Sequence, residues 1–216
     1  MKKISILLVS VLFASFFLSS VQAEQKFEEE LHYFSVIPEQ PGGEGDRIQL
    51  IEFFWYGCSH CFTLEPHLES WLAKKPDNVD FMRIPAMFSR PEVALHAKTY
   101  YALELMGVID DLHARLFHAI NEEHRRLRMQ SEMETFLDEQ GVDLERYRKA
   151  MKSFAVQTQA RRAAVLASRF DVRGVPAIVV DGKYRTSGLN GAVMMDVTDF
   201  LIEKVVADER EKGGTQ

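Results

Sequence analysis

Cysteine is scarce in this chain: its 216 residues contain two, Cys58 and Cys61, three positions apart. Two cysteines exclude the disulfide framework that holds many small secreted proteins together. A bridge between them would close too short a loop to restrict the unfolded chain much, so stabilisation is a poor explanation for the pair. A second CxxC motif and paired histidines are also missing, and a closed zinc site would need four such ligands. The chemistry of one CxxC motif therefore dominates the interpretation.

Basic residues are also fewer than acidic ones. Lysine and arginine number 26 against 32 aspartates and glutamates, a formal net charge of −6. This balance argues against nucleic acid or an anionic membrane surface as the partner. One basic run, His124–Arg128, follows two glutamates, and we interpret it as a solvated helix end.

Long hydrophobic runs are absent except for Ile4–Leu18, which at 15 residues is shorter than the ~20 that span a bilayer. Lys2 and Lys3 precede this run and Val21-Gln22-Ala23 follows it, the pattern of a secretory signal peptide over residues 1–23. We expect the mature chain to begin near Glu24 and to carry a net charge of −8, because the leader removes two lysines and no acids. Export predicts an oxidising compartment, which is the periplasm in a Gram-negative bacterium.

Internal repeats are absent, and the hydrophobic pattern divides the chain into α and β segments. Strands are expected at 47–55, 79–84, 175–180 and 183–185, the last two joined by the turn Asp181-Gly182. Helices are expected at 58–74, over most of 89–169, and at 193–207. The predicted fold class is α/β, a small sheet domain interrupted by an all-helical insertion. Its parts are 24–87 and 169–207 for the sheet domain, 88–168 for the insertion and 208–216 for a frayed tail.

Three segments carry helix-capping signals. Ser89 with Glu92, and Ser131 with Glu134, have the spacing of a capping box. Asp143 is placed to cap a helix that begins at Leu144.

The CxxC motif lies where an apolar strand runs into a helix. Cys58 at the helix start would have its thiolate favoured by unpaired backbone N–H groups and the helix dipole, whereas Cys61, one turn later, would be shielded. His60 could add positive charge near Cys58, or it could be an exposed polar residue with no role. Glu52 is a carboxylate in an apolar run, and alternation places it on the inward face with Leu50. Burial there would raise its proton affinity and suit it to exchange protons with Cys61, whereas on an exposed face it would do nothing.

Three motifs together resemble the DsbA family of periplasmic thiol oxidases: Phe53-Phe54-Trp55-Tyr56-Gly57-Cys58-Ser59-His60-Cys61, Arg173-Gly174-Val175-Pro176-Ala177 and Asp181-Gly182-Lys183-Tyr184. The resemblance covers almost all of the mature chain and implies a thioredoxin fold with a helical insertion. It implies that Cys58 attacks and is attacked, that Cys61 resolves the mixed disulfide, and that Glu52 relays protons. It also implies a cis bond before Pro176 and a substrate-binding backbone at Val175, in the manner of strand addition.

The same resemblance implies a monomer that needs neither cofactor nor metal, donates its disulfide to exported proteins with cysteines, and is reoxidised by a DsbB-like membrane partner. Two residues depart from the type member: Ser59 stands in place of a proline and Arg83 in place of a lysine. An arginine cannot release its proton, so a relay would rest on Glu52 and water.

Two other hypotheses stay open. One is an isomerase or reductase in the same compartment, although residues 24–37 leave no room for the separate dimerisation domain of dedicated isomerases. The other is a soft-metal module that uses Cys58, Cys61, His60 and His67.

Overall fold

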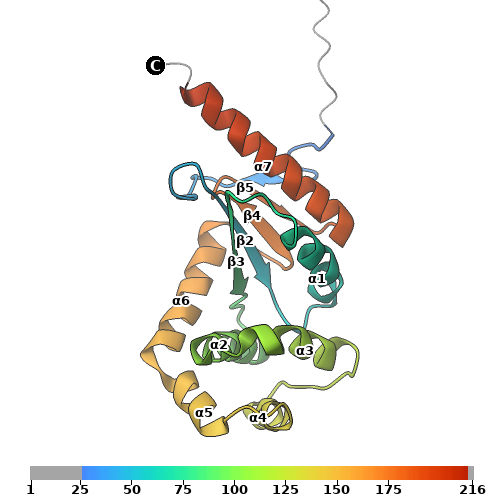
Figure 1. Ribbon diagram of the computed structural model, residues 1–216, viewed down its shortest axis with the longest axis vertical. Coiled ribbons are helices and arrows are strands. Elements are labelled where there is room, and N and C mark those ends of the chain that lie inside the picture. The colour runs from blue at the N-terminus through green and yellow to red at the C-terminus, as the bar shows by residue number, and fades with distance from the viewer. Residues whose placement is uncertain (1–25, 214–216) are drawn as a thin grey trace, which may run out of the picture.

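The protein is described by a computed structural model that covers residues 26–213 (Figure 1). The expected signal peptide, 1–23, and the expected start of the mature chain near Glu24 lie outside the described residues. The strands are β1 (Phe34–Ser35), β2 (Ile48–Phe54), β3 (Val79–Pro85), β4 (Ala177–Val180) and β5 (Tyr184–Ser187). The helices are α1 (Ser59–Leu72), α2 (Pro91–Met106), α3 (Ile109–Asn121), α4 (Gln130–Glu139), α5 (Leu144–Lys152), α6 (Phe154–Arg169) and α7 (Gly191–Gly213). Within 26–213, no helix combines the length and apolar character needed to cross a membrane.

The strands form one mixed sheet in the order β1-β5-β4-β2-β3. β2 pairs parallel to β3 and antiparallel to β4, and its register places Glu52 opposite Arg83 on β3. The turn from β4 to β5 has positive φ at Asp181 and Gly182, +52° and +65°, at the two residues where the sequence predicted a turn. The register pairs Val180 with Tyr184, so the hairpin loop has three residues, 181–183, and β5 begins one residue later than expected. β2, the strand that leads to the CxxC motif, therefore lies inside the sheet, where its apolar residues are buried on both sides.

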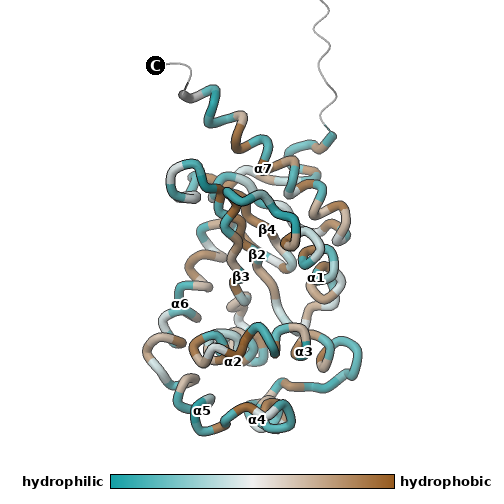
Figure 2. Tube along the Cα trace, viewed as in Figure 1, coloured by the Kyte–Doolittle hydropathy of each residue, from teal (hydrophilic) through white to brown (hydrophobic). Residues whose placement is uncertain are grey.

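Helices cover the two faces of the sheet. α1 and α7 lie on one face and α6 on the other, while α2 to α5 extend beyond one end of the sheet (Figure 1). Alternate residues of β2 follow this division, with Leu50 in the core beneath α1 and α7 and Phe53 in the core beneath α6. The central strands β2 and β4 are mainly hydrophobic, whereas the loop from α3 to α4 is mainly hydrophilic (Figure 2).

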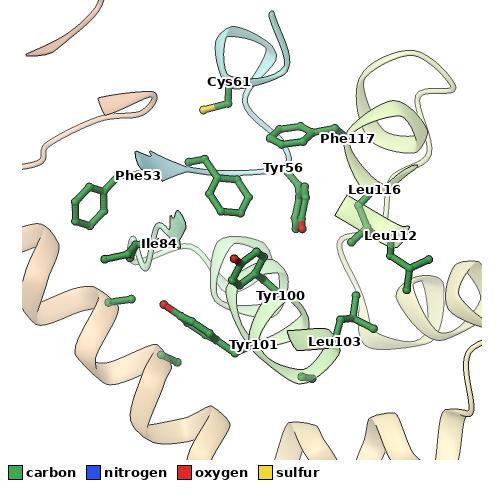
Figure 3. Close-up of a cluster of buried hydrophobic side chains, with 14 of the residues drawn as sticks. Phe53, Tyr56, Cys61, Ile84, Tyr100, Tyr101, Leu103, Leu112, Leu116 and Phe117 are labelled. Carbon is green, nitrogen blue, oxygen red and sulfur yellow. The ribbon is translucent and has the colours of Figure 1, made fainter. Parts of the chain in front are cut away.

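The helical segment shares a core with the end of the sheet nearest the cysteines. Phe54 and Tyr56, at the end of β2, pack edge-on with their ring centroids 5.1 Å apart. The ring centroid of Tyr56 also lies 4.9 Å from that of Phe117 on α3. Figure 3 shows Cys61 at the border of this cluster, beside Phe117 and above Tyr100. Five helices, α2 to α6, separate β3 from β4 in the chain, as the expected insertion requires. Their packing fixes the surroundings of the CxxC motif.

Several local predictions need correction. α7 continues to Gly213, so the tail expected from residue 208 begins as helix. The Tyr184 hydroxyl donates to Asp208, and Lys183 pairs with Glu209, which ties this last part of α7 to the hairpin. Short β1 was also not predicted.

The caps expected from serines are wrong, whereas the aspartate cap is confirmed. α2 begins at Pro91 with Arg90 as its N-cap, because proline is favoured in the first turn. α4 is capped by Glu132, which accepts hydrogen bonds from the N–H groups of Arg128 and Met129. Asp143 accepts from the N–H groups at 145 and 146 and caps α5.

Candidate active site

The CxxC motif begins helix α1, immediately beyond the end of β2. Cys58 is the N-cap residue of α1, and its N–H donates to the carbonyl of Trp55 at 2.9 Å. Gly57 is required at the turn, because a Cβ there would lie 2.3 Å from the Trp55 ring. The short connection therefore delivers the Cys58 sulfur to the positive end of the helix.

The two sulfurs have different environments. Cys58 is half-buried, and Cys61 is fully buried. The Cys61 N–H donates to Cys58 Sγ at 3.4 Å. Hydrogen bonding from the Cys61 thiol, then from the backbone N–H groups of Cys61 and His60, lowers the pKa of Cys58 to about 6 against an opposing effect of burial. Burial first, then the neighbouring Cys58, raises the pKa of Cys61 far above its ordinary value.

Pro176 and Val175 lie next to the pair, although they are more than 100 residues away in the chain. Cys58 Sγ lies 3.3 Å from the Val175 carbonyl oxygen, and the Val175–Pro176 peptide bond is cis, as the resemblance implied. A second cis bond, Ile37–Pro38, was not predicted. The backbone before β4 therefore faces the reactive sulfur.

Glu52 is fully buried beneath α1, as alternation along β2 predicted. Burial, followed by the charge of Glu65, raises the pKa of Glu52 to about 8, and Arg83 acts in the opposite direction. The charge of Glu52 is also among the influences that raise the pKa of Cys61. The two groups are therefore electrostatically linked, and both favour the protonated form near neutral pH.

Arg83 holds Glu52 in an ionic network. Its Nε donates to Glu52 Oε2 at 3.1 Å, and its Nη2 donates to Glu65 at 3.3 Å and Glu69 at 2.5 Å. His113 Nε2 lies 3.5 Å from Glu65, and the other ring nitrogen of His113 bonds the Tyr56 hydroxyl at 2.9 Å. The network thus runs from β2 across β3 and α1 to α3.

A hollow of about 560 Å³ lies beside this network between α1 and α3, and Glu65, Glu69, Arg83 and His113 are among its lining residues. Two buried atoms of its lining residues, Glu65 Oε1 and His113 Nε2, have no hydrogen-bond partner among the described residues, and neither has Glu52 Oε1, whose other oxygen is bonded by the lining residue Arg83. Buried polar atoms of this kind are usually satisfied by water. The hollow is large enough to bring water to the network.

His60 is exposed at the start of α1. Its charge is the smallest of the influences that lower the pKa of Cys58, below the contribution of its own backbone N–H. In the described part of the chain, no three His, Cys, Asp or Glu side chains group closely enough to hold a metal ion.

Comparison with known proteins identifies the family of the chain. Residues 49–202 match the sequence model of the DSBA-like thioredoxin domain. The chain belongs to this family. It is 38% identical to the thiol:disulfide interchange protein DsbA of Pseudomonas syringae over 194 residues, which cover 88% of this chain and 90% of that protein. The corresponding DsbA of Pseudomonas aeruginosa is 37% identical over 202 residues, covering 92% and 95%.

Solved DsbA structures have the same architecture. The crystal structure of Pseudomonas aeruginosa DsbA aligns with a TM-score of 0.78 and 36% identity, over 85% of this chain and 97% of that one. The predicted fold class, a thioredoxin fold with a helical insertion, is confirmed. As a member of the DsbA family, the chain is a protein disulfide oxidoreductase.

Sequence reasoning missed most of the ionic network around Glu52. Glu65 lies four residues after Cys61 on α1, a spacing that places the two on one helix face and could have identified it. His113 and Tyr56 had no such signal, because their contact depends on how α3 packs against the end of β2.

Proposed function

We propose that the Cys58–Cys61 disulfide is donated to newly exported proteins in the periplasm and is restored by a DsbB-like membrane oxidase. The observation that carries this proposal is the difference between the two sulfurs. Cys58 is accessible and has a lowered pKa, whereas Cys61 is buried and has a raised one. The accessible sulfur is the one that a client can reach, and a stabilised Cys58 thiolate favours the reduced product of the donor.

The exchange runs through a mixed disulfide. A client thiolate attacks Cys58 Sγ, the Cys58–Cys61 bond breaks, and Cys61 leaves with the electron pair and must take a proton. A second client thiolate then attacks the client sulfur of the mixed disulfide, and Cys58 leaves as a thiolate. The client loses two electrons and two protons. The protein gains both electrons and one proton, which Cys61 holds, and the other proton passes to water. In the reverse direction, Cys61 resolves mixed disulfides formed at Cys58.

Glu52 supplies the proton that Cys61 takes. A carboxyl group with a pKa of about 8 is protonated at neutral pH and can act as a general acid inside the protein. Arg83 keeps its own proton and positions Glu52 through the bond at 3.1 Å. Water from the hollow between α1 and α3 returns the proton to Glu52 after each exchange.

Val175 and Pro176 hold the client chain. The client backbone would lie along the segment before β4, whose Val175 carbonyl is 3.3 Å from Cys58 Sγ. The client cysteine would then approach Cys58 from the open side of the motif. The protein acts as a monomer in this scheme, since one chain contributes every group named.

The test is oxidation of a two-cysteine peptide by the oxidised protein, followed by acid quenching, alkylation and mass spectrometry. In a companion test, the reduced Cys61→Ser variant is offered the peptide in its disulfide form. The Cys58 thiolate should attack that disulfide, release one peptide thiol and accumulate as a mixed disulfide, while Cys58→Ser should form none. A parallel assay on a protein with scrambled disulfides separates the isomerase alternative. Efficient rearrangement without net oxidation of the peptide would contradict the proposal.

A further inference from the structure

A second hollow lies beside the CxxC motif, on the side of Trp55. Its volume is about 220 Å³, and its lining includes Trp55, Ile120, His124, Arg126, Arg128 and Glu92. We call it the Trp55 pocket. The loop from α3 to α4 supplies its cationic wall, and this loop is hydrophilic in Figure 2.

The cationic wall is anchored to the core. Leu127, between the two arginines, is 2% exposed, and its carbonyl lies 2.8 Å from His96 Nε2. The Trp55 indole N–H donates to His96 Nδ1 at 3.0 Å, so the ring hydrogen of a neutral His96 must be on Nε2 and donated to Leu127. Positive φ at His124 and Leu127, +56° and +40°, turns the chain so that Leu127 points inward. The arginines therefore project from a backbone that is connected through His96 to Trp55.

Cationic charge is in excess at this pocket. Arg125 pairs with Glu139, and Arg90 lies 3.6 Å from Glu92 and stacks over the Trp55 ring at 4.5 Å. Arg126 and Arg128 are exposed and have no carboxylate partner among residues 26–213. This local excess contrasts with the formal charge of −6 for the whole chain.

The pocket is close to the reacting sulfur. Gly57, which also lines it, directly precedes Cys58, and the Trp55 carbonyl accepts the Cys58 N–H. A peptide whose cysteine is bound at Cys58 can therefore reach it with a nearby side chain. Arginine guanidinium groups match a carboxylate by forming paired hydrogen bonds.

We propose that the Trp55 pocket binds a carboxylate side chain of the client, close in sequence to the client cysteine, through Arg126 and Arg128. This inference rests on the proposed function and adds a substrate preference to it. A client chain is the occupant that fits, because the pocket is small and concave and adjoins the exchange site. An anionic membrane would need a broad basic face, and the acidic chain as a whole opposes it.

The test uses pairs of two-cysteine peptides that differ by one residue, glutamate or glutamine, at successive positions on either side of the first cysteine. The rate constant for oxidation of each peptide is measured by quenching and alkylation. The readout is the ratio of the rate constant of the glutamate peptide to that of the glutamine peptide in the same pair. We expect a glutamate advantage of about threefold at the favoured position, typical of an exposed ion pair, and its loss at ~0.5 M salt.

The double variant R126Q/R128Q should bring the ratio to about one. The matched control R146Q/R161Q removes the same charge from exposed positions on α5 and α6 and should keep the ratio. The charge-reversed variant R126E/R128E should instead prefer a lysine peptide.

NMR titration with cysteine-free versions of the peptides measures binding without oxidation, and so separates this inference from the proposed function. If the glutamate peptide binds more tightly but neither cysteine peptide is oxidised, the inference stands and the proposed function fails. Equal rates and equal binding within every pair would overturn the inference. So would binding to phosphatidylglycerol vesicles that depends on Arg126 and Arg128 while the peptide ratio stays at one.

Discussion

Replacing Glu52 with glutamine keeps the shape of the side chain and removes its titration. Burial raises the pKa of Glu52 from 4.5 to about 8, so the folded protein holds this proton more tightly than the unfolded chain does. The stability that this proton contributes is complete below pH 4.5 and is lost as pH rises towards 8. At ~1.4 kcal/mol per pH unit, the loss between pH 5 and pH 8 is on the order of 4 kcal/mol.

Urea denaturation of the reduced protein at several pH values would measure this effect. The free energy of unfolding of Glu52→Gln should exceed that of the native protein by an amount that grows between pH 5 and pH 8. Glu69→Gln is the matched control, because Glu69 also bonds Arg83 but is 58% exposed. A difference between the native protein and Glu52→Gln that does not change with pH would refute the assignment of a raised pKa.

The same variant tests the role of Glu52 in proton transfer. Without the carboxyl proton, Cys61 must leave as a buried thiolate or wait for water. We expect peptide oxidation at pH 6 to slow about a hundredfold, at the low end of general acid catalysis, while formation of the folded protein is unaffected. The rate difference should shrink above pH 8, where native Glu52 is also ionised. Equal rates at pH 6 would leave water as the proton carrier.

Three further predictions concern the cysteine pair and its neighbours. Iodoacetamide at pH 6.5 should label Cys58 of the reduced protein in preference to Cys61, and mass spectrometry showing the opposite would reverse their assigned roles. The reduced protein should melt at a higher temperature than the oxidised one. Folding lowers the pKa of Cys58 from 9.0 to about 6, so the difference in melting temperature should be largest above pH 9 and should shrink as pH falls towards 6. His60→Ala should raise the pKa of Cys58 by less than ~1, since the backbone N–H of residue 60 is retained. Thiolate absorbance at 240 nm would measure this pKa. An unchanged value would show that the His60 side chain does not affect the Cys58 thiolate.

Local patterns predicted the parts of the fold that depend on neighbouring residues. The helix start at Cys58, the burial of Glu52 and the turn at Asp181 follow from alternation, helix spacing and turn chemistry. Serine caps failed at both places, because Pro91 and Glu132 offered better ways to begin those helices.

The ionic network could not be predicted in the same way. Arg83 meets Glu52 across the β2–β3 register, and it meets Glu65 and Glu69 because α1 packs over that register. His113 joins them from α3, 48 residues after Glu65. Such contacts depend on the assembled tertiary structure, so residues that looked like surface charges in the sequence became partners of a buried acid.

Two electrostatic systems therefore flank Cys58, and they should respond to different variables. The network of Glu52, Arg83 and Glu65 is largely buried between β2, β3 and α1, where mobile ions screen charges weakly. Its influence on Cys61 should therefore depend on pH and little on salt. Arg126 and Arg128 are exposed at the Trp55 pocket, so their influence on a client should depend on salt and little on pH between 6 and 8, where arginine does not titrate. Rates of peptide oxidation measured over a grid of pH and ionic strength would separate the two contributions in the native protein. If salt altered the pH dependence of a neutral peptide as strongly as the preference for an acidic one, the two systems would be coupled through Cys58.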